Sequence, residues 1–255
     1  MSQQKDQILA EMGIKPLWRL RQASPAEPQA EPVPPVPLAD DAELVVREQK
    51  LEPAVPHSVP EPALSGVAGM DWDTLGEAVS ACQACRLCER RKQAVLGVGD
   101  PHADWMLVGE GPGAEEDARG EPFVGQAGKL LDAMLAAIAL KRGENVYIAN
   151  AVKCRPPGNR TPEPAEIEAC RPYLERQIAL VKPKLILAMG RPAAQTLIGG
   201  EVKIGAARGK LFSYLDVPVI VTYHPAYLLR NLPDKARAWE DLCFAKDQMA
   251  RLAST

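Results

Sequence analysis

From residue 71 onward, short apolar runs typical of buried strands alternate with longer stretches of helical periodicity. The strand-like runs are Trp105–Val108, Val146–Ala149, Leu185–Met189 and Val217–Thr222. The helical patterns cover residues 73–91, 126–141, 163–181, 191–198 and 233–252. Strands that alternate with helices are typical of a parallel sheet with helices on both faces. The sequence therefore predicts an α/β fold, with three α/β/α layers around a central, mainly parallel four-stranded sheet.

The segment before this alternating region has a different composition. Ten of the 24 prolines fall within residues 24–65, among Ala, Glu and Val. Such a stretch cannot bury enough apolar surface to offset the entropy lost on ordering, so we expect a disordered linker over 22–70. Residues 1–21 have the spacing of a short amphipathic helix, which either packs on the main domain or binds a partner protein. The main domain is predicted to span 71–255.

Composition excludes some classes of protein and leaves others open. No apolar run reaches the roughly 20 residues of a membrane span, and the N-terminus lacks the apolar core of a secretory signal. We therefore expect a cytoplasmic protein without a membrane partner, acting as a monomer. The 30 basic and 33 acidic residues give a net charge of −3. This total offers no evidence for nucleic-acid binding, although a local basic patch would be compatible with it.

Five of the six cysteines fall in a pattern that suits metal ligation. Cys82, Cys85 and Cys88 lie close together on the first predicted helix, Cys154 follows the second strand, and Cys170 lies in a later helix. In a cytoplasmic chain, clustered cysteines indicate metal or redox chemistry rather than structural disulfides. Two close and two remote thiolates can hold either zinc or an iron–sulfur cluster. The spacing alone does not distinguish zinc from an iron–sulfur cluster. It also does not decide whether Cys82 and Cys85 or Cys85 and Cys88 form the close C-x2-C pair.

Polar residues follow the predicted strands where a ligand site is expected. In open parallel sheets, ligands bind at the carboxyl ends of the strands. Glu110 lies in the turn GEGPG after the first strand, Asn150 directly follows the second, and His224 follows the last. A carboxylate, an amide and an imidazole at neighbouring strand ends can converge on one small polar ligand.

Together these motifs resemble those of family 4 uracil-DNA glycosylases, the iron–sulfur members of that superfamily. The resemblance runs from about residue 73 to 250 and rests on CQACRL, GEGPGAEED, GEPFVGQAGKLLD, VYIANAVKCRPPGNR, Cys170-Arg171-Pro172, Met189-Gly190 and TYHPAYLLRN. It implies a DNA repair enzyme that flips uracil out of single- or double-stranded DNA. Such an enzyme hydrolyses the N-glycosidic bond and leaves an abasic site.

The resemblance also implies a [4Fe-4S] cluster rather than zinc. Matching CQACRL makes Cys82 and Cys85 the close pair of ligands, with Cys154 and Cys170 as the remote ones. Cys88 lies at a position where the family needs no ligand. It is the alternative to Cys82 as a cluster ligand, because Cys85 and Cys88 also form a C-x2-C pair.

The same resemblance gives the strand-end residues roles toward uracil. Phe123 would stack on the uracil ring, and Asn150 would pair with its polar edge. His224 would donate a hydrogen bond near uracil O2 while charge builds on the departing base. Gly111 and Pro112 would line the pocket for the base.

Two acidic residues and a set of basic and apolar residues complete the expected site. Either Glu110 or Glu116 would orient the attacking water, and the sequence does not decide between them. The residues expected to contact DNA are Lys153, Arg155, Arg160, Leu228, Leu229 and Arg230.

Two other functions are compatible with these patterns. One is a non-catalytic iron–sulfur or zinc module that binds nucleic acid. The other is an electron carrier. The presence of Glu110, Phe123, Asn150 and His224 together favours the enzyme, because neither alternative needs that combination.

Overall fold

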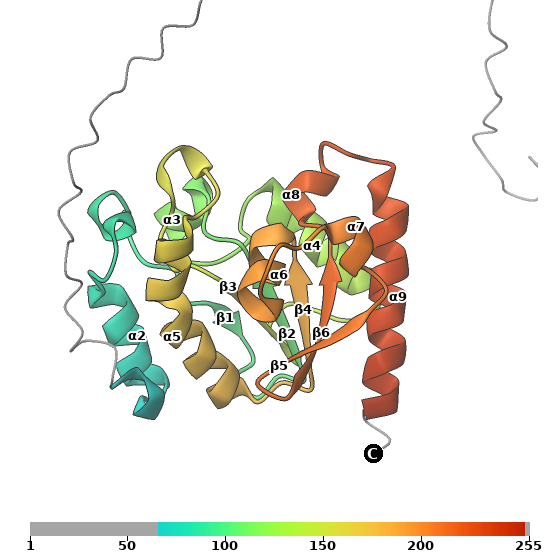
Figure 1. The fold of residues 1–255 in the computed structure, drawn as a ribbon, viewed down its shortest axis with the longest axis horizontal. Coiled ribbons are helices and arrows are strands. Elements are labelled where there is room, and N and C mark those ends of the chain that lie inside the picture. The colour runs from blue at the N-terminus through green and yellow to red at the C-terminus, as the bar shows by residue number, and fades with distance from the viewer. Residues whose placement is uncertain (1–65, 253–255) are drawn as a thin grey trace, which may run out of the picture. The chain divides into compact units, whose positions relative to one another are not determined.

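The computed structural model describes residues 66–252, which form a six-stranded sheet in the order β1-β3-β2-β4-β6-β5 (Figure 1). The four central strands are parallel to one another: β2 (Trp105–Gly109), β3 (Val146–Asn150), β4 (Leu185–Met189) and β6 (Val217–Thr222). They lie at the predicted positions and confirm the α/β fold. Their residues are almost all buried, as is typical of parallel strands covered on both faces.

The prediction of four strands was wrong because two edge strands are added. β1 (Val98–Gly99) pairs antiparallel with β3, and β5 (Leu211–Tyr214) pairs antiparallel with β6. β1 is only two residues long, and β5 alternates exposed and half-buried positions. Neither strand therefore has the continuous apolar run that identified the central four.

Helices cover both faces of the sheet. Their bounds are α2 (Trp72–Ala81), α3 (Ala114–Arg119), α4 (Gln126–Ala137), α5 (Pro164–Val181), α6 (Arg191–Ile198), α7 (Ile204–Ala207), α8 (Pro225–Leu228) and α9 (Asp234–Leu252), with 3-10 turns η2 (Val67–Gly69), η3 (Arg86–Glu89) and η4 (Pro157–Asn159). Side chains alternate along each strand. Leu107 and Leu187 therefore pack against α4 and α9, while Met106 and Ile186 pack against α5 and α6. This arrangement confirms the three layers.

The first predicted helix, 73–91, is shorter than expected. α2 ends at Ala81, and Cys82 follows with extended backbone (ψ 132°). After Val79 the next buried apolar side chain in the sequence is Leu87. No apolar stripe therefore continues through the cysteines, which lie on a loop and on η3 rather than on a helix.

The described domain begins slightly before the predicted boundary at residue 71. Val67, near the end of the predicted linker, is only 1% exposed, and Arg176 Nε donates a hydrogen bond to Met70 O. The predicted helix at 1–21 and the linker up to residue 65 lie outside the described residues. Among residues 66–252, no helix is both long and apolar enough to cross a membrane.

Candidate active site and cysteine cavity

A cleft of about 750 Å³ lies at the carboxyl ends of the parallel strands. It is lined by Glu110 after β2, Asn150 at the end of β3, Arg191 after β4 and His224 after β6. Further predicted site residues in its lining are Gly111, Pro112, Glu116, Phe123, Arg160 and Arg230. Pockets for small ligands commonly enclose roughly 300–1,000 Å³. The sheet topology thus brings together residues separated by more than one hundred positions in the chain.

Asn150 places an unpaired acceptor in the wall of this cleft. Its side chain is 2% exposed, and its Oδ1 has no hydrogen-bond partner within the part of the chain that the structure describes. Buried polar atoms nearly always find a partner, so an orphaned acceptor in a cleft indicates a ligand that donates. Gly109 makes room for this atom, because a Cβ there would lie 2.5 Å from Asn150 Oδ1 and 2.6 Å from Phe123 Cζ.

Phe123 is held against the cleft by an unusual backbone conformation. Its φ of 54° is left-handed, which is uncommon for a bulky residue and costs of the order of 1–3 kcal/mol. Arg142 secures this turn by donating to Phe123 O at 2.8 Å and to Pro122 O at 2.9 Å. Gly128 of α4 lets the carbonyl approach, since a Cβ there would lie 1.8 Å from Phe123 O. The turn therefore presents the Phe123 ring, which lies 5.4 Å from the imidazole of His224.

The imidazole of His224 is fixed in one tautomer. Its Nδ1 accepts a hydrogen bond from Ala226 N at 3.1 Å, so the neutral ring carries its proton on Nε2. Burial lowers the pKa of His224 to about 4, and the positive charge of Arg230 acts in the same direction. Near pH 7 the ring is therefore a neutral donor. Gly190 permits this position, because a Cβ there would lie 2.9 Å from His224 Cβ.

The two candidate acids occupy different environments. Both carboxylate oxygens of Glu116 accept backbone N–H groups, from Gly113 at 3.1 Å, Val124 at 3.0 Å and Gly125 at 3.2 Å. Glu116 thereby fastens the loop that carries Phe123. Burial raises the pKa of Glu110, opposed by a hydrogen bond with Thr161 and by the charge of Arg191. Glu110 interacts with side chains that line the cleft, whereas Glu116 is engaged by the backbone.

Two of the residues expected to contact DNA are buried, and that expectation is wrong for them. Lys153 is 1% exposed, and its Nζ donates to Asn150 O at 2.8 Å and to Gln177 Oε1. Leu228 is also 1% exposed and packs in the core beneath α8. A DNA phosphate therefore cannot reach Lys153. Leu228 is held in the core and cannot insert into a duplex.

The other expected DNA contacts lie near the surface. Leu229 is 41% exposed, and Arg230 lines the cleft beside it. Arg160 lies on the cleft rim, but its guanidinium forms a bidentate pair with the buried Glu166 at 2.7 and 2.8 Å. Arg155 lies on the same segment, half-buried and outside the cleft lining. Of the two basic residues of this set that line the cleft, Arg230 is thus the one without an ion pair among the described residues.

Sequence reasoning missed several residues of the cleft. Arg191 lies two residues after the end of β4, and the strand-end rule places it at this edge of the sheet, but no role was predicted for it. Tyr223 and Tyr227 stack in the lining with ring centroids 5.2 Å apart, and no motif predicted this pair.

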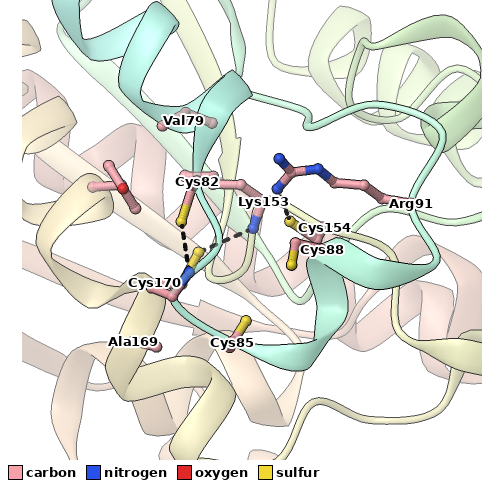
Figure 2. Close-up of a pocket in the computed structure, with 11 residues that line it drawn as sticks. Val79, Cys82, Cys85, Cys88, Arg91, Lys153, Cys154, Ala169 and Cys170 are labelled. Atoms are coloured by element: carbon pink, nitrogen blue, oxygen red, sulfur yellow. Dashed lines mark hydrogen bonds between the residues drawn. The ribbon is translucent and has the colours of Figure 1, made fainter. Parts of the chain in front are cut away.

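The cysteines surround a second cavity, lined by the loop after α2, η3, the segment after β3 and α5 (Figure 2). Its lining includes Cys82, Cys85, Cys88, Cys154 and Cys170. Four of these sulfurs accept N–H groups: Cys82 from Ala84 at 3.5 Å, Cys85 from Leu87, Cys154 from Arg91 at 2.9 Å, and Cys170 from Lys153 at 3.2 Å. No such donor is recorded for Cys88 among the described residues. The four sulfurs with donors are the four predicted ligands.

Several of these thiols resist ionisation in the protein alone. Burial raises the pKa of Cys170 to about 12 and that of Cys85 to about 11, and repulsion from neighbouring sulfurs adds to both shifts. A positively charged metal group would reverse this effect, because thiolates are the metal-binding form. Within residues 66–252, no three His, Cys, Asp or Glu side chains are arranged around a point suited to a single metal ion.

Comparison with known proteins places this geometry in a family. Residues 96–243 match the model of the uracil DNA glycosylase superfamily. The chain is similar to a type-4 uracil-DNA glycosylase of Pyrobaculum aerophilum, with 43% identity over 68% of this chain and 92% of the relative. It is also similar to that of Thermotoga maritima, with 44% identity over 65% and 86%. A type-5 uracil-DNA glycosylase of Thermus thermophilus matches at 34% identity over 47% and 70%. The chain therefore belongs to the uracil-DNA glycosylase superfamily, and within it to the type-4 enzymes.

Proposed function

We propose that this chain hydrolyses the bond between uracil and deoxyribose in DNA, leaving an abasic site. The observation that carries the proposal is the orphaned Oδ1 of Asn150 in the cleft wall. Uracil offers a donor at N3 and an acceptor at O4, which match the oxygen and the nitrogen of an amide. Cytosine presents an acceptor at N3 and a donor at N4. It would leave buried polar groups unpaired, which discriminates strongly.

His224 and Glu110 supply the charges that the reaction needs. As the C1′–N1 bond breaks, negative charge builds on uracil, and positive charge builds on the sugar. The neutral Nε2–H of His224 would donate to uracil O2 and stabilise the leaving group. The carboxylate of Glu110 would orient water toward C1′ and stabilise the sugar cation. Glu116 would act as a positioning residue, because backbone N–H groups already occupy both its oxygens.

The flipped base would enter beside Phe123, whose ring would stack on it. Arg230 and Arg191 at the cleft would bind the DNA backbone, with Arg160 contributing less because Glu166 neutralises it. Leu229, exposed next to Arg230, would fill the space that the base vacates. We further propose that the enzyme acts as a monomer, because one chain supplies the residues of the cleft, and that it works in the cytoplasm.

We also propose that Cys82, Cys85, Cys154 and Cys170 hold a [4Fe-4S] cluster. Their thiol-only donor set fits such a group, and each sulfur already accepts an N–H of the kind that stabilises cluster thiolates. When bound, the cluster would tie the segment after β3 to α5 and to the loop after α2. The cavity that would hold it shares no lining residue with the cleft, which suits a structural role.

The test is excision from oligonucleotides that differ only at one base. Purified protein is incubated with single- and double-stranded DNA containing one uracil, and with thymine and cytosine counterparts, followed by alkaline cleavage of abasic sites. Strand breaks and free uracil from the uracil substrates alone are expected. Binding without release of uracil would overturn the proposal in favour of a non-catalytic nucleic-acid-binding module.

A further inference from the structure

Lys153 joins the cysteine cavity to the substrate cleft through both its backbone and its side chain. Its backbone N donates to Cys170 Sγ at 3.2 Å, while its Nζ donates to the carbonyl oxygen of Asn150 at 2.8 Å. The neighbouring residue in the chain is Cys154, which lines the same cavity. One residue thus contacts a candidate cluster ligand, beside which Figure 2 shows it, and the backbone of the residue that would read uracil.

The side chain of Lys153 is set into a network that leaves little freedom. Gln177 accepts from Nζ with its Oε1. The amide nitrogen of Gln177 donates to Leu96 O at 2.8 Å and to the hydroxyl of Tyr147 at 3.0 Å, which fixes the orientation of the amide. Lys153 is among the largest fully buried side chains of the described residues. Preorganised networks of this kind hold a neighbouring group within a narrow range of positions.

A buried ammonium requires a negative partner, because an isolated charge inside a protein is costly. No carboxylate of the described residues is recorded in an ion pair with Lys153. The ionisable groups that share its cavity and lie next to it are Cys170, whose Sγ accepts its backbone N–H at 3.2 Å, and Cys154, the next residue in the chain. Thiolates bound to a cluster carry negative charge that would balance this cation. A cluster in the cysteine cavity would therefore account for the burial of the Lys153 ammonium.

We propose that Lys153 is a positioning residue that couples the cluster to Asn150, with its ammonium serving as counter-ion to the cluster thiolates and as tether for the Asn150 carbonyl. This inference rests on the proposed cluster and glycosylase activity. It predicts that the charge of Lys153 influences the cluster, while its hydrogen bond influences excision.

The test compares Lys153→Met, which removes charge and donor, with Lys153→Gln, which removes the charge but retains a donor. Lys92→Gln is the matched control, because Lys92 is exposed on the loop that follows the cysteines. Iron and sulfide content, absorbance near 400 nm, the midpoint potential of the cluster, and kcat and KM are measured for all proteins. Iron and sulfide in the wild-type protein test the cluster itself, separately from the coupling.

Both Lys153 variants should shift the midpoint potential to lower values, since loss of a positive charge disfavours the reduced cluster. Lys153→Met should lower kcat about 10-fold or more with little change in KM for DNA, and Lys153→Gln should recover part of that loss. If Lys153→Met is insoluble, the potential and kcat of Lys153→Gln carry the test. A potential and kcat equal to wild type would overturn the proposal. A rise in KM with a shallower salt dependence would also overturn it, because that result indicates a phosphate contact.

Discussion

Replacing Gly109 with alanine tests how tightly the cleft positions its uracil-reading residues. The new Cβ would lie 2.5 Å from Asn150 Oδ1, whereas ordinary contact begins at 3.4 Å, so one of the two groups must move by about 0.9 Å. Phe123 Cζ, 2.6 Å from the same Cβ, is also too close and would have to move. A displacement of about 1 Å at a reacting group can lower the rate roughly 100-fold. We therefore expect kcat/KM for uracil excision to fall by about two orders of magnitude.

A matched control separates this effect from the general consequences of adding a methyl group. Gly76 lies within α2, and a Cβ there would meet Leu96 at 3.7 Å, an ordinary contact. Gly76→Ala should leave excision unchanged and raise the melting temperature slightly, as alanine favours the helix. Excision is measured with a uracil oligonucleotide, and folding by thermal denaturation. A Gly109→Ala enzyme within about threefold of wild type would refute the reasoning.

Three further changes test other parts of the cleft. The pKa of His224 is about 4 rather than the ordinary 6.5, so its ring should stay neutral and kcat/KM should stay constant from about pH 8 to about pH 5 and fall below that. A loss of kcat/KM centred near pH 6.5 would instead indicate that the His224 ring becomes protonated there. Arg142→Met should release the strained turn at Phe123 and lower kcat/KM about 10-fold or more, with folding checked by thermal denaturation. Unchanged activity would mean that the turn keeps its conformation without Arg142. Leu229→Ala should weaken excision from double-stranded DNA more than from single-stranded DNA, since only a duplex leaves a gap to fill; equal losses on both substrates would argue against the wedge.

The parts of the fold that could be predicted from sequence are those with a continuous local pattern. The four central strands are nearly unbroken apolar runs, and α6 and α9 begin close to where their patterns begin. Each strand end then marks a position at the same edge of the sheet, which is why Glu110, Asn150 and His224 could be expected to meet. β5 was missed because half-exposed edge strands lack such a run.

Other features depend on three-dimensional contacts that no local pattern records. Leu228 and Leu229 are adjacent and chemically identical, yet only the turn after α8 decides which one is buried. The sequence suggested that Lys153 is an exposed basic residue. Its burial could not be predicted, because Gln177 and most of the cavity beside it come from other segments of the chain. The contact between Arg142 and Phe123 likewise joins two loops across a helix.

A crystal structure with DNA containing a uracil nucleotide made resistant to hydrolysis by a 2′-fluoro group tests the central claim most directly. The account predicts the base flipped into the cleft, with Asn150 Oδ1 about 2.7–3.2 Å from uracil N3 and His224 Nε2 at similar distance from O2. A uracil that remained stacked in the bound DNA, or one held away from Asn150, would contradict it.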